Sequence, residues 1–211
     1  MHFDGFDDDA ITFYRELTLR NDRAFWLENR DRYENRVAGP MHALADALAP
    51  EFGAARLFRP YRDVRFSRHK SPYKLHAGLT FERGGYVQVS AEGVAAGAGV
   101  YLFDRDQLER YRRAVDAPAT GAALERAVAA VEAAGHAIVV PDRLKTAPRG
   151  FRPEAGEPPH PRAELLRYKG LVAWTDWGIP DWFATAAAAD EIARFLRESE
   201  PVSGWLRDTV R

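Results

Sequence analysis

The chain has 211 residues, 46% of them hydrophobic and 29% charged, a balance typical of globular proteins that bury a sizeable core. It has no cysteine, which excludes disulfides, thiolate metal sites and cysteine nucleophiles and is compatible with the reducing cytoplasm, where we expect the protein to act. Its formal net charge of −1 gives no overall nucleic-acid signature, its acidic N-terminus is unlike a signal peptide, and no apolar run reaches the roughly 18 residues that would indicate a membrane span.

The N-terminal quarter is predicted to be helical. An acidic cluster at residues 7–9 can cap a first helix, and Asn21-Asp22 interrupts the apolar periodicity and caps a second one. Gly39-Pro40 ends the second helix and starts a third, since proline suits the first helical turn. The three helices are predicted over residues 11–20, 23–37 and 40–52.

The middle of the chain changes to the two-residue period of strands. Short apolar runs separated by Arg83-Gly84 and Glu92-Gly93 indicate an antiparallel meander. Strands are predicted over residues 61–67, 77–82, 85–91 and 94–102. The glycines at 93, 97 and 99 lack the spacing of a dinucleotide site and predict close packing within strands.

The remainder is predicted to be mixed. Asp104 and Thr120 each cap a helix, and the second of these helices stops at Gly135. Residues 141–161, rich in proline, glycine and charge, form a long ordered loop that we expect to cover a site. The other predicted elements are strands over 137–140 and 171–177, a helix over 161–170, and a helical region from 180 that is interrupted before Pro201.

These elements predict a single α+β domain over residues 1–211. We expect a helical layer at 1–54, a central and mostly antiparallel sheet with a basic segment at 55–102, and C-terminal helices, short strands and a covering loop at 103–211 packed over the sheet. The sequence does not set the oligomeric state.

Residues 56–76, here called the basic block, carry the strongest functional signal. The block holds one acid, Asp63, and has a local net charge of +6, which repels itself unless an anion or a set of carboxylates lies among the cations. Its cations are Arg56, Arg59, Arg62, Arg65, Arg68, Lys70 and Lys74.

A strand over the block would place Asp63 and Arg65 on one face, so that the carboxylate orients the guanidinium. Guanidinium groups match phosphate oxygens bidentately, and each hydrogen bond to a charged group contributes about 1.5–3 kcal/mol. Three or four such donors could hold a phosphoryl group at micromolar affinity before binding costs are subtracted. We therefore expect a small anionic, phosphorylated ligand, bound by Arg62, Arg65, Lys70 and Lys74.

Further candidates lie outside the block. Asn21, Arg23 and Trp26 are predicted to contact the ligand, or alternatively to cap a helix and fill the core. Arg149 and Lys169 either approach the same anion from the covering loop or serve solubility.

If the protein is an enzyme, the first candidates for proton transfer are Asp63, Tyr73 and Lys74. His69 and His76 flank the basic turn, as proton shuttles or as hydrogen-bonding loop residues. The chain carries no HExxH and no paired-carboxylate helix motif, so neither a metal nor another cofactor is expected.

Two other classes of function stay open. A nucleic-acid-binding module would use the cations together with Tyr61, Phe66 and Tyr73 as stacking surfaces. An interaction or scaffold protein would instead dock an acidic partner on its basic face. The helical N-terminus could itself be that partner, through a charge network with Glu28, Asp31 and Glu34. No membrane partner is expected.

Five blocks of the sequence form a recognisable signature: Asn21-Asp22-Arg23 with Trp26, residues 62–67 (RDVRFS), residues 70–74 (KSPYK), residues 147–151 (APRGF), and Leu165-Leu166 with Lys169-Gly170. These blocks resemble the signature of one family of conserved hypothetical proteins from bacteria and fungi, catalogued as a domain of unknown function. The resemblance covers residues 3–206 in order. The sequence differs from the family pattern at His69, where an acid or amide is usual, and at Leu75, where threonine is usual.

Overall fold

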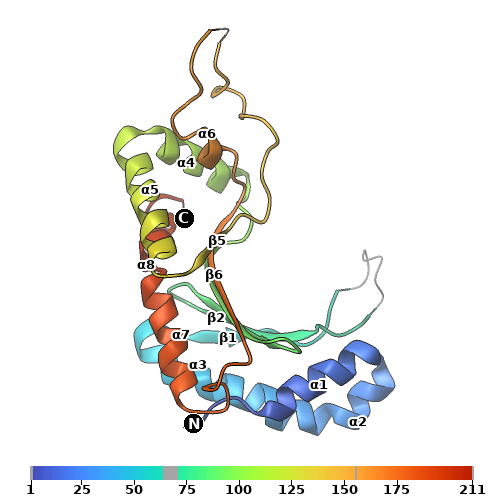
Figure 1. Ribbon diagram of the computed structural model, residues 1–211. Coiled ribbons are helices and arrows are strands. Elements are labelled where there is room, and N and C mark those ends of the chain that lie inside the picture. Colours follow the sequence, from blue (N-terminus) through green and yellow to red (C-terminus); the bar gives the residue numbers. More distant parts are fainter. Residues whose placement is uncertain (1, 64–70, 155, 211) are drawn as a thin grey trace. The chain divides into compact units, whose positions relative to one another are not determined.

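The computed structural model describes residues 2–63, 71–154 and 156–210 (Figure 1). The chain divides into two compact units, and β4, β6 and α7 each pass from one unit to the other. The first unit comprises Met1–Ala96 and Asp176–Phe195, and the second comprises Gly97–Thr175 and Leu196–Arg211. The predicted α+β class is confirmed, with helices before and after a sheet of order β1-β2-β3-β4-β6-β5.

The first unit begins with the predicted helical layer. Its helices are α1 (Asp8–Leu19), α2 (Arg23–Tyr33) and α3 (Gly39–Phe52), with a π-helical turn η1 (Glu34–Ala38) that joins α2 to α3. Asp7 caps α1 by accepting a hydrogen bond from the Asp9 amide, and Asp22 caps α2 by accepting one from the Phe25 amide. These contacts confirm both predicted caps, whereas the π-helical turn was not predicted.

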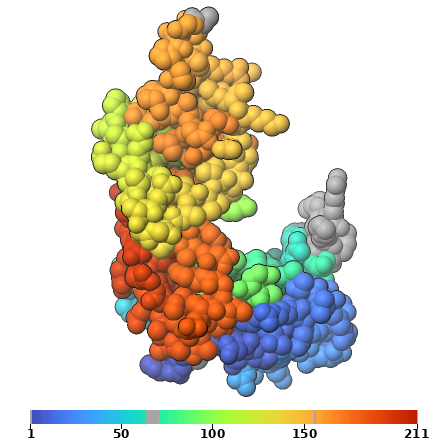
Figure 2. Space-filling view, in the orientation of Figure 1, coloured from blue at the N-terminus to red at the C-terminus, as the bar shows by residue number. Residues whose placement is uncertain are grey.

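Aromatic side chains form the core of the helical layer. The Phe13 ring, which is fully buried, lies 5.8 Å from Phe25, 6.2 Å from Trp26 and 5.7 Å from Tyr33, measured between ring centroids. The space-filling view shows these N-terminal helices, in blue, packed against one another (Figure 2).

The sheet of the first unit is antiparallel, as predicted. Its strands β1 (Ala55–Leu57), β2 (His76–Phe81) and β3 (Tyr86–Ser90) are followed by β4 (Gly93–Val100). Alternation along β2 and β3 places apolar side chains on one buried face, which α1 and α3 contact. The buried face consists of Ala77, Leu79, Phe81, Val87 and Val89.

The second unit is built from helices and the outer strands. Its complete elements are α4 (Arg105–Asp116), α5 (Pro118–Ala133), β5 (Ala137–Val139), α6 (Ala163–Leu166) and α8 (Glu200–Thr209). It also contains β6 (Leu171–Gly178) as far as Thr175, and the end of α7 (Ala187–Glu198) from Leu196. Asp104 caps α4 in a capping box with Gln107, as predicted.

Two predicted boundaries in the second unit are wrong. Helix α5 begins at Pro118, and the Thr120 hydroxyl, predicted to cap it, donates instead to the Ala114 carbonyl at 2.5 Å. Proline at the first helical position explains the earlier start, because its fixed φ already suits a helix. The helix predicted over 161–170 is a single turn, α6.

Among the described residues, no helix is long and apolar enough to cross a membrane.

Candidate functional site

The described part of the basic block forms two segments that run antiparallel, here called the basic limb (residues 58–63 and 71–76). Tyr61 and Tyr73 form an isolated bridge between the segments. The Arg62 amide donates to the Pro72 carbonyl at 2.8 Å, and the Lys74 amide donates to the Pro60 carbonyl at 2.7 Å.

Part of the block lies outside the described residues, namely 64–70. This gap contains two of the predicted anion ligands, Arg65 and Lys70, and most of the strand predicted over 61–67. The proposed orientation of Arg65 by Asp63 therefore stays a prediction.

The hydrogen-bond pattern gives the basic limb two faces. In an antiparallel pair whose flanking residues make the hydrogen bonds, the two opposed side chains point to the same face. Tyr61 and Tyr73 therefore share one face, and Arg62 and Lys74 point to the other. The limb separates its aromatic side chains from its cations.

The aromatic face packs on the helical layer. Trp26 of α2 stacks on Tyr73, with ring centroids 4.4 Å apart and planes 10° apart, and lies 5.8 Å from Tyr61. Trp26 and Tyr73 are each 4% exposed, whereas Tyr61 is 49% exposed. Trp26 is thus a core residue that holds the limb, and its direct contact with a ligand stays a prediction.

Asn21 fixes the limb through its backbone. The Asn21 side-chain amide donates to the Tyr73 carbonyl at 3.0 Å, and its oxygen accepts from the Tyr73 amide at 3.0 Å. A single side chain therefore satisfies both backbone groups of a buried residue. This contact makes Asn21 an anchor of the limb, at the backbone edge of the segment that carries Lys74.

The cationic face carries Arg62 and Lys74, with Arg59 close by. The Lys74 ammonium lies 5.1 Å from the Phe58 ring centroid. Burial lowers the pKa of Lys74, and repulsion by Arg59 lowers it further. Burial also lowers the pKa of His76, followed by repulsion from Lys74 and Arg62. The positive charges are therefore close enough to destabilise one another.

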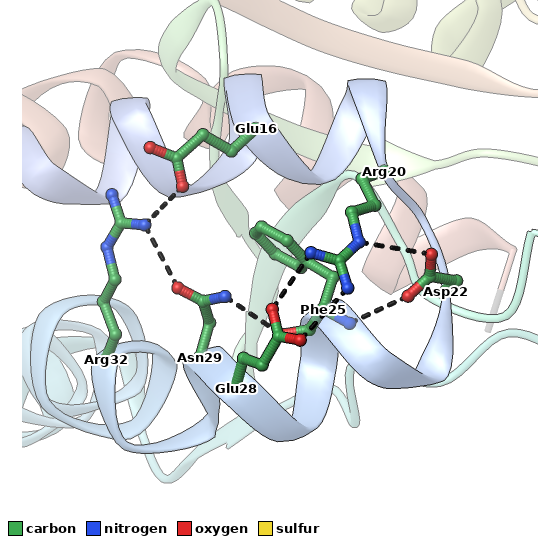
Figure 3. A network of polar contacts seen from close by, with 7 residues as sticks. All are labelled: Glu16, Arg20, Asp22, Phe25, Glu28, Asn29 and Arg32. Atoms are coloured by element: carbon green, nitrogen blue, oxygen red, sulfur yellow. Dashed lines mark hydrogen bonds and ion pairs between the residues drawn. The ribbon is translucent and has the colours of Figure 1, made fainter.

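No ion pair joins Arg59, Arg62 or Lys74 to a carboxylate among the residues that the structure describes. In the helical layer, Glu16, Asp22 and Glu28 bind arginines of that layer instead (Figure 3). Glu28 accepts hydrogen bonds from Arg20 at 3.0 and 3.1 Å, and Arg32 binds Glu16 and Asn29.

The carboxylates considered for an internal charge network thus leave the described limb cations unmatched. Glu28 is taken by Arg20. Neither Asp31 nor Glu34 forms an ion pair with any described residue of the basic limb.

Other predicted site residues lie at several places. Arg23 is exposed at the start of α2, in the first unit. Arg149 and Lys169 belong to the second unit, where Arg149 is exposed and the Lys169 ammonium binds the Asp142 carboxylate at 2.8 Å. Their approach to the anion of the basic limb stays a prediction.

The sequence did not indicate the roles of Asn21 and Phe58. Asn21 contacts a residue 52 positions away, so no local pattern could show the pairing. In the second unit, His136 links two elements in a similar way: its ring nitrogens lie 2.6 Å from the Thr175 hydroxyl and 2.7 Å from the Glu198 carboxylate. Among the described residues, no cluster of three His, Asp or Glu side chains could hold a metal ion.

Comparison with known proteins gives a family and one structural likeness. A family model described as a conserved hypothetical protein (DUF2461) matches residues 9–205. A conserved hypothetical protein from Pyrococcus furiosus has a solved structure that is 16% identical, with a TM-score of 0.36, over 82% of this chain and 96% of that chain. No curated protein matches.

Proposed function

Since the chain belongs to the DUF2461 family of conserved hypothetical proteins, we propose from the geometry of the basic limb that it is a cytoplasmic protein that binds a small anionic, phosphorylated ligand. One observation carries the proposal. Arg62 and Lys74 point to the same face of the limb, and neither has a carboxylate partner among the described residues.

The energetics favour an anion on this face. Burial is the largest cause of the lowered pKa values of Lys74 and His76, and repulsion from neighbouring cations is the second. Such repulsion destabilises the folded chain. A phosphoryl group relieves it and accepts hydrogen bonds worth about 1.5–3 kcal/mol each. Arg62 and Lys74 alone would then contribute a substantial part of the roughly 8 kcal/mol that micromolar affinity needs, and Arg65 and Lys70 are proposed to add the rest.

Should the ligand be turned over, Lys74 is the first described candidate for proton transfer, because its lowered pKa eases loss of a proton. Tyr73 is less suitable, since burial raises its pKa and its ring is stacked on Trp26. Asp63 is the third candidate.

A nucleic-acid-binding module is the second candidate function. Tyr61 supports it, because this half-exposed ring lies next to Arg62 in the chain and offers one face to a base. Tyr73 argues against it, since its stacked and buried ring has no free face. The scaffold alternative is disfavoured by the pairing of Glu28 with Arg20, which removes one carboxylate from the supposed charge network.

Thermal unfolding in the presence of AMP, ribose 5-phosphate or a single-stranded oligonucleotide tests the proposal. A ligand at 100 times its Kd stabilises by about 2.7 kcal/mol, which raises the Tm of a chain of this size by about 5–10 °C. We expect this rise for a small phosphate with wild type and with the control Arg126→Ala, whose exposed arginine lies on α5. The double variant Arg62→Ala, Lys74→Ala should show none.

The outcomes separate the candidates. If the double variant responds to phosphates as wild type does, the proposed site is wrong. If only the oligonucleotide raises the Tm, and its affinity falls linearly with the logarithm of salt concentration, the nucleic-acid function replaces the small-ligand function.

A further inference from the structure

His76 lies on the outer face of the sheet, opposite the core. It is the first residue of β2, where Ala77, Leu79 and Phe81 are buried. Because side chains alternate along a strand, the half-buried His76 and Thr80 point to the other face. The imidazole has no hydrogen-bond partner among the described residues, so its nitrogens are free to meet a ligand.

The basic limb brings its cations over this same face. The Phe58 amide donates to the Gly78 carbonyl at 2.8 Å, which places Phe58 directly beside Gly78, two residues from His76. The Lys74 ammonium lies over the Phe58 ring. The position of Phe58 therefore brings Lys74 to the neighbourhood of His76.

The charged groups around His76 are positive. Burial lowers the pKa of its imidazole, and Lys74 and Arg62 of the limb lower it further. From β3, the residue paired with His76 is Ser90, and its hydroxyl holds the Glu92 carboxylate at 3.0 Å. Tyr86 of β3 lies on the same face of the sheet as His76. Besides burial, the described groups that lower the pKa of the imidazole are the cations Lys74 and Arg62.

We infer that His76 is a specificity-determining residue of this site, and that it selects a terminal phosphate monoester over a phosphodiester. This inference rests on the proposed function and narrows its ligand. A monoester carries about −1.5 to −2 charges at pH 7 and three free oxygens, whereas a diester carries one charge and two free oxygens. Arg62 and Lys74 balance two negative charges of the ligand. A protonated His76 donates a further hydrogen bond, and a dianion stabilises its positive charge more strongly than a monoanion does.

Binding is then coupled to proton uptake. In the free protein, burial and then the neighbouring cations favour the neutral imidazole. A phosphate dianion reverses this balance and raises the pKa of His76, so the complex binds a proton that the free protein lacks. Affinity for a monoester should therefore increase as the pH falls from 8 towards 6.5. It should decrease below about pH 6, where the phosphate takes up its own second proton.

Methyl phosphate and dimethyl phosphate form a matched pair of probes, since they differ by one methyl group and one ionisable oxygen. The measurement is the pKa of each imidazole from NMR titration with either probe. His76→Gln assigns the His76 signal among the six histidines, and His42→Gln assigns that of His42, an exposed control on α3. We expect methyl phosphate to raise the pKa of His76 by about one pH unit, which corresponds to about tenfold tighter binding to the protonated than to the neutral imidazole. The pKa of His42 should not change.

The outcomes separate this inference from the proposed function. If both probes bind in a way that Arg62→Ala with Lys74→Ala abolishes, yet the pKa of His76 does not move or moves equally with both, the inference fails and the proposed function stands. If dimethyl phosphate binds as tightly as methyl phosphate, the monoester preference also fails. If neither probe binds at any pH between 6 and 8, both the inference and the proposed function fail.

Discussion

Asn21 commits its whole side-chain amide to one buried residue. Both polar atoms of the amide bind the backbone of Tyr73, and Tyr73 in turn stacks on Trp26. The position of Lys74, the next residue, therefore depends on a side chain that belongs to the helical layer. A substitution far from the cations should disturb the anion site through this contact.

Asn21→Ala should lower the free energy of unfolding by about 1–3 kcal/mol, because it leaves a buried amide and a buried carbonyl of Tyr73 unpaired. Urea denaturation measures the loss. Asn35→Ala is the matched control, since that amide also donates to a backbone carbonyl, of Asp31 at 2.8 Å, but at an exposed site. Equal losses for the two variants would contradict a special role for the contact.

At the scale of one residue, the sequence predicts where an important side chain lies better than it predicts which residue that side chain contacts. The prediction that Asp22 caps a helix follows from a local rule, and the structure confirms it. For the neighbouring Asn21 the sequence predicts a contact with the ligand or a helix cap, because no local pattern indicates a contact with Tyr73. Contacts between residues far apart in the chain depend on the fold, and a single sequence does not record them.

The helices α1 and α2 are joined by polar contacts across their surface. Arg32 of α2 donates from Nε to the Asp9 carboxylate at 2.7 Å and from another nitrogen to Glu16, so one guanidinium holds two acids of α1. The hydrogen bond from Arg32 lowers the pKa of Asp9. These contacts fix the helix that carries Trp26.

Arg32→Met should lower the free energy of unfolding by about 1–3 kcal/mol at pH 7, since it breaks hydrogen bonds between charged groups that are only partly exposed. The pKa of Asp9 is lower in the folded chain than its usual value of about 3.9. Its stabilising effect is therefore complete above about pH 5 and is lost as the pH falls through the lowered pKa of the folded state. Urea denaturation between pH 3 and 7 should show a shallower pH dependence for the variant.

The control for Arg32 is Arg30→Met, on the exposed side of the same helix. It should leave both the stability and its pH dependence unchanged within about 0.5 kcal/mol. A loss as large as that of Arg32→Met would show that the effect comes from helix propensity or net charge rather than from the contacts with α1.

At the scale of elements, the aspartate caps and the glycine turns were predicted well, whereas the cap at Thr120 and the irregular segments were not. Asp104 and the turns after β2 and β3 follow from short local patterns, and the structure has them where they were expected. The turn η1 follows from no such pattern, because its residues also suit an ordinary helix. The single turn α6 was predicted too long, since Pro161 and Gly170 mark boundaries without showing that Arg167 to Lys169 leave the helix.

In the sheet, close contacts at glycines hold β4 against β6. Gly93 has φ +121°, and a Cβ there would lie 1.8 Å from the Gly178 carbonyl oxygen. Within the second unit, a Cβ at Gly97 would lie 2.8 Å from the Trp174 ring. Close packing within strands was predicted for these glycines from sequence, because they lack the spacing of a nucleotide-binding loop.

Gly93→Ala should destabilise the protein by more than about 3 kcal/mol, since it adds a steric clash with backbone to an unfavourable φ. Gly84→Ala is the matched control: its φ is +108°, yet nothing lies within 4 Å of the added Cβ, so it should cost only the conformational part, about 1–2 kcal/mol. Urea denaturation compares the two. Similar losses would show that the close approach to Gly178 contributes little.

The first unit is discontinuous along the chain, because Asp176–Phe195 complete it after Gly97–Thr175 have formed part of the second. A ribosome delivers the two parts separately, with about a hundred residues between Ala96 and Phe195, or roughly 5–20 s of synthesis. Until β6 is made, the nascent first unit has an unpaired sheet edge at β4. Translation speed over this stretch, and whatever shields the waiting edge, should therefore govern how much of the newly made protein escapes aggregation.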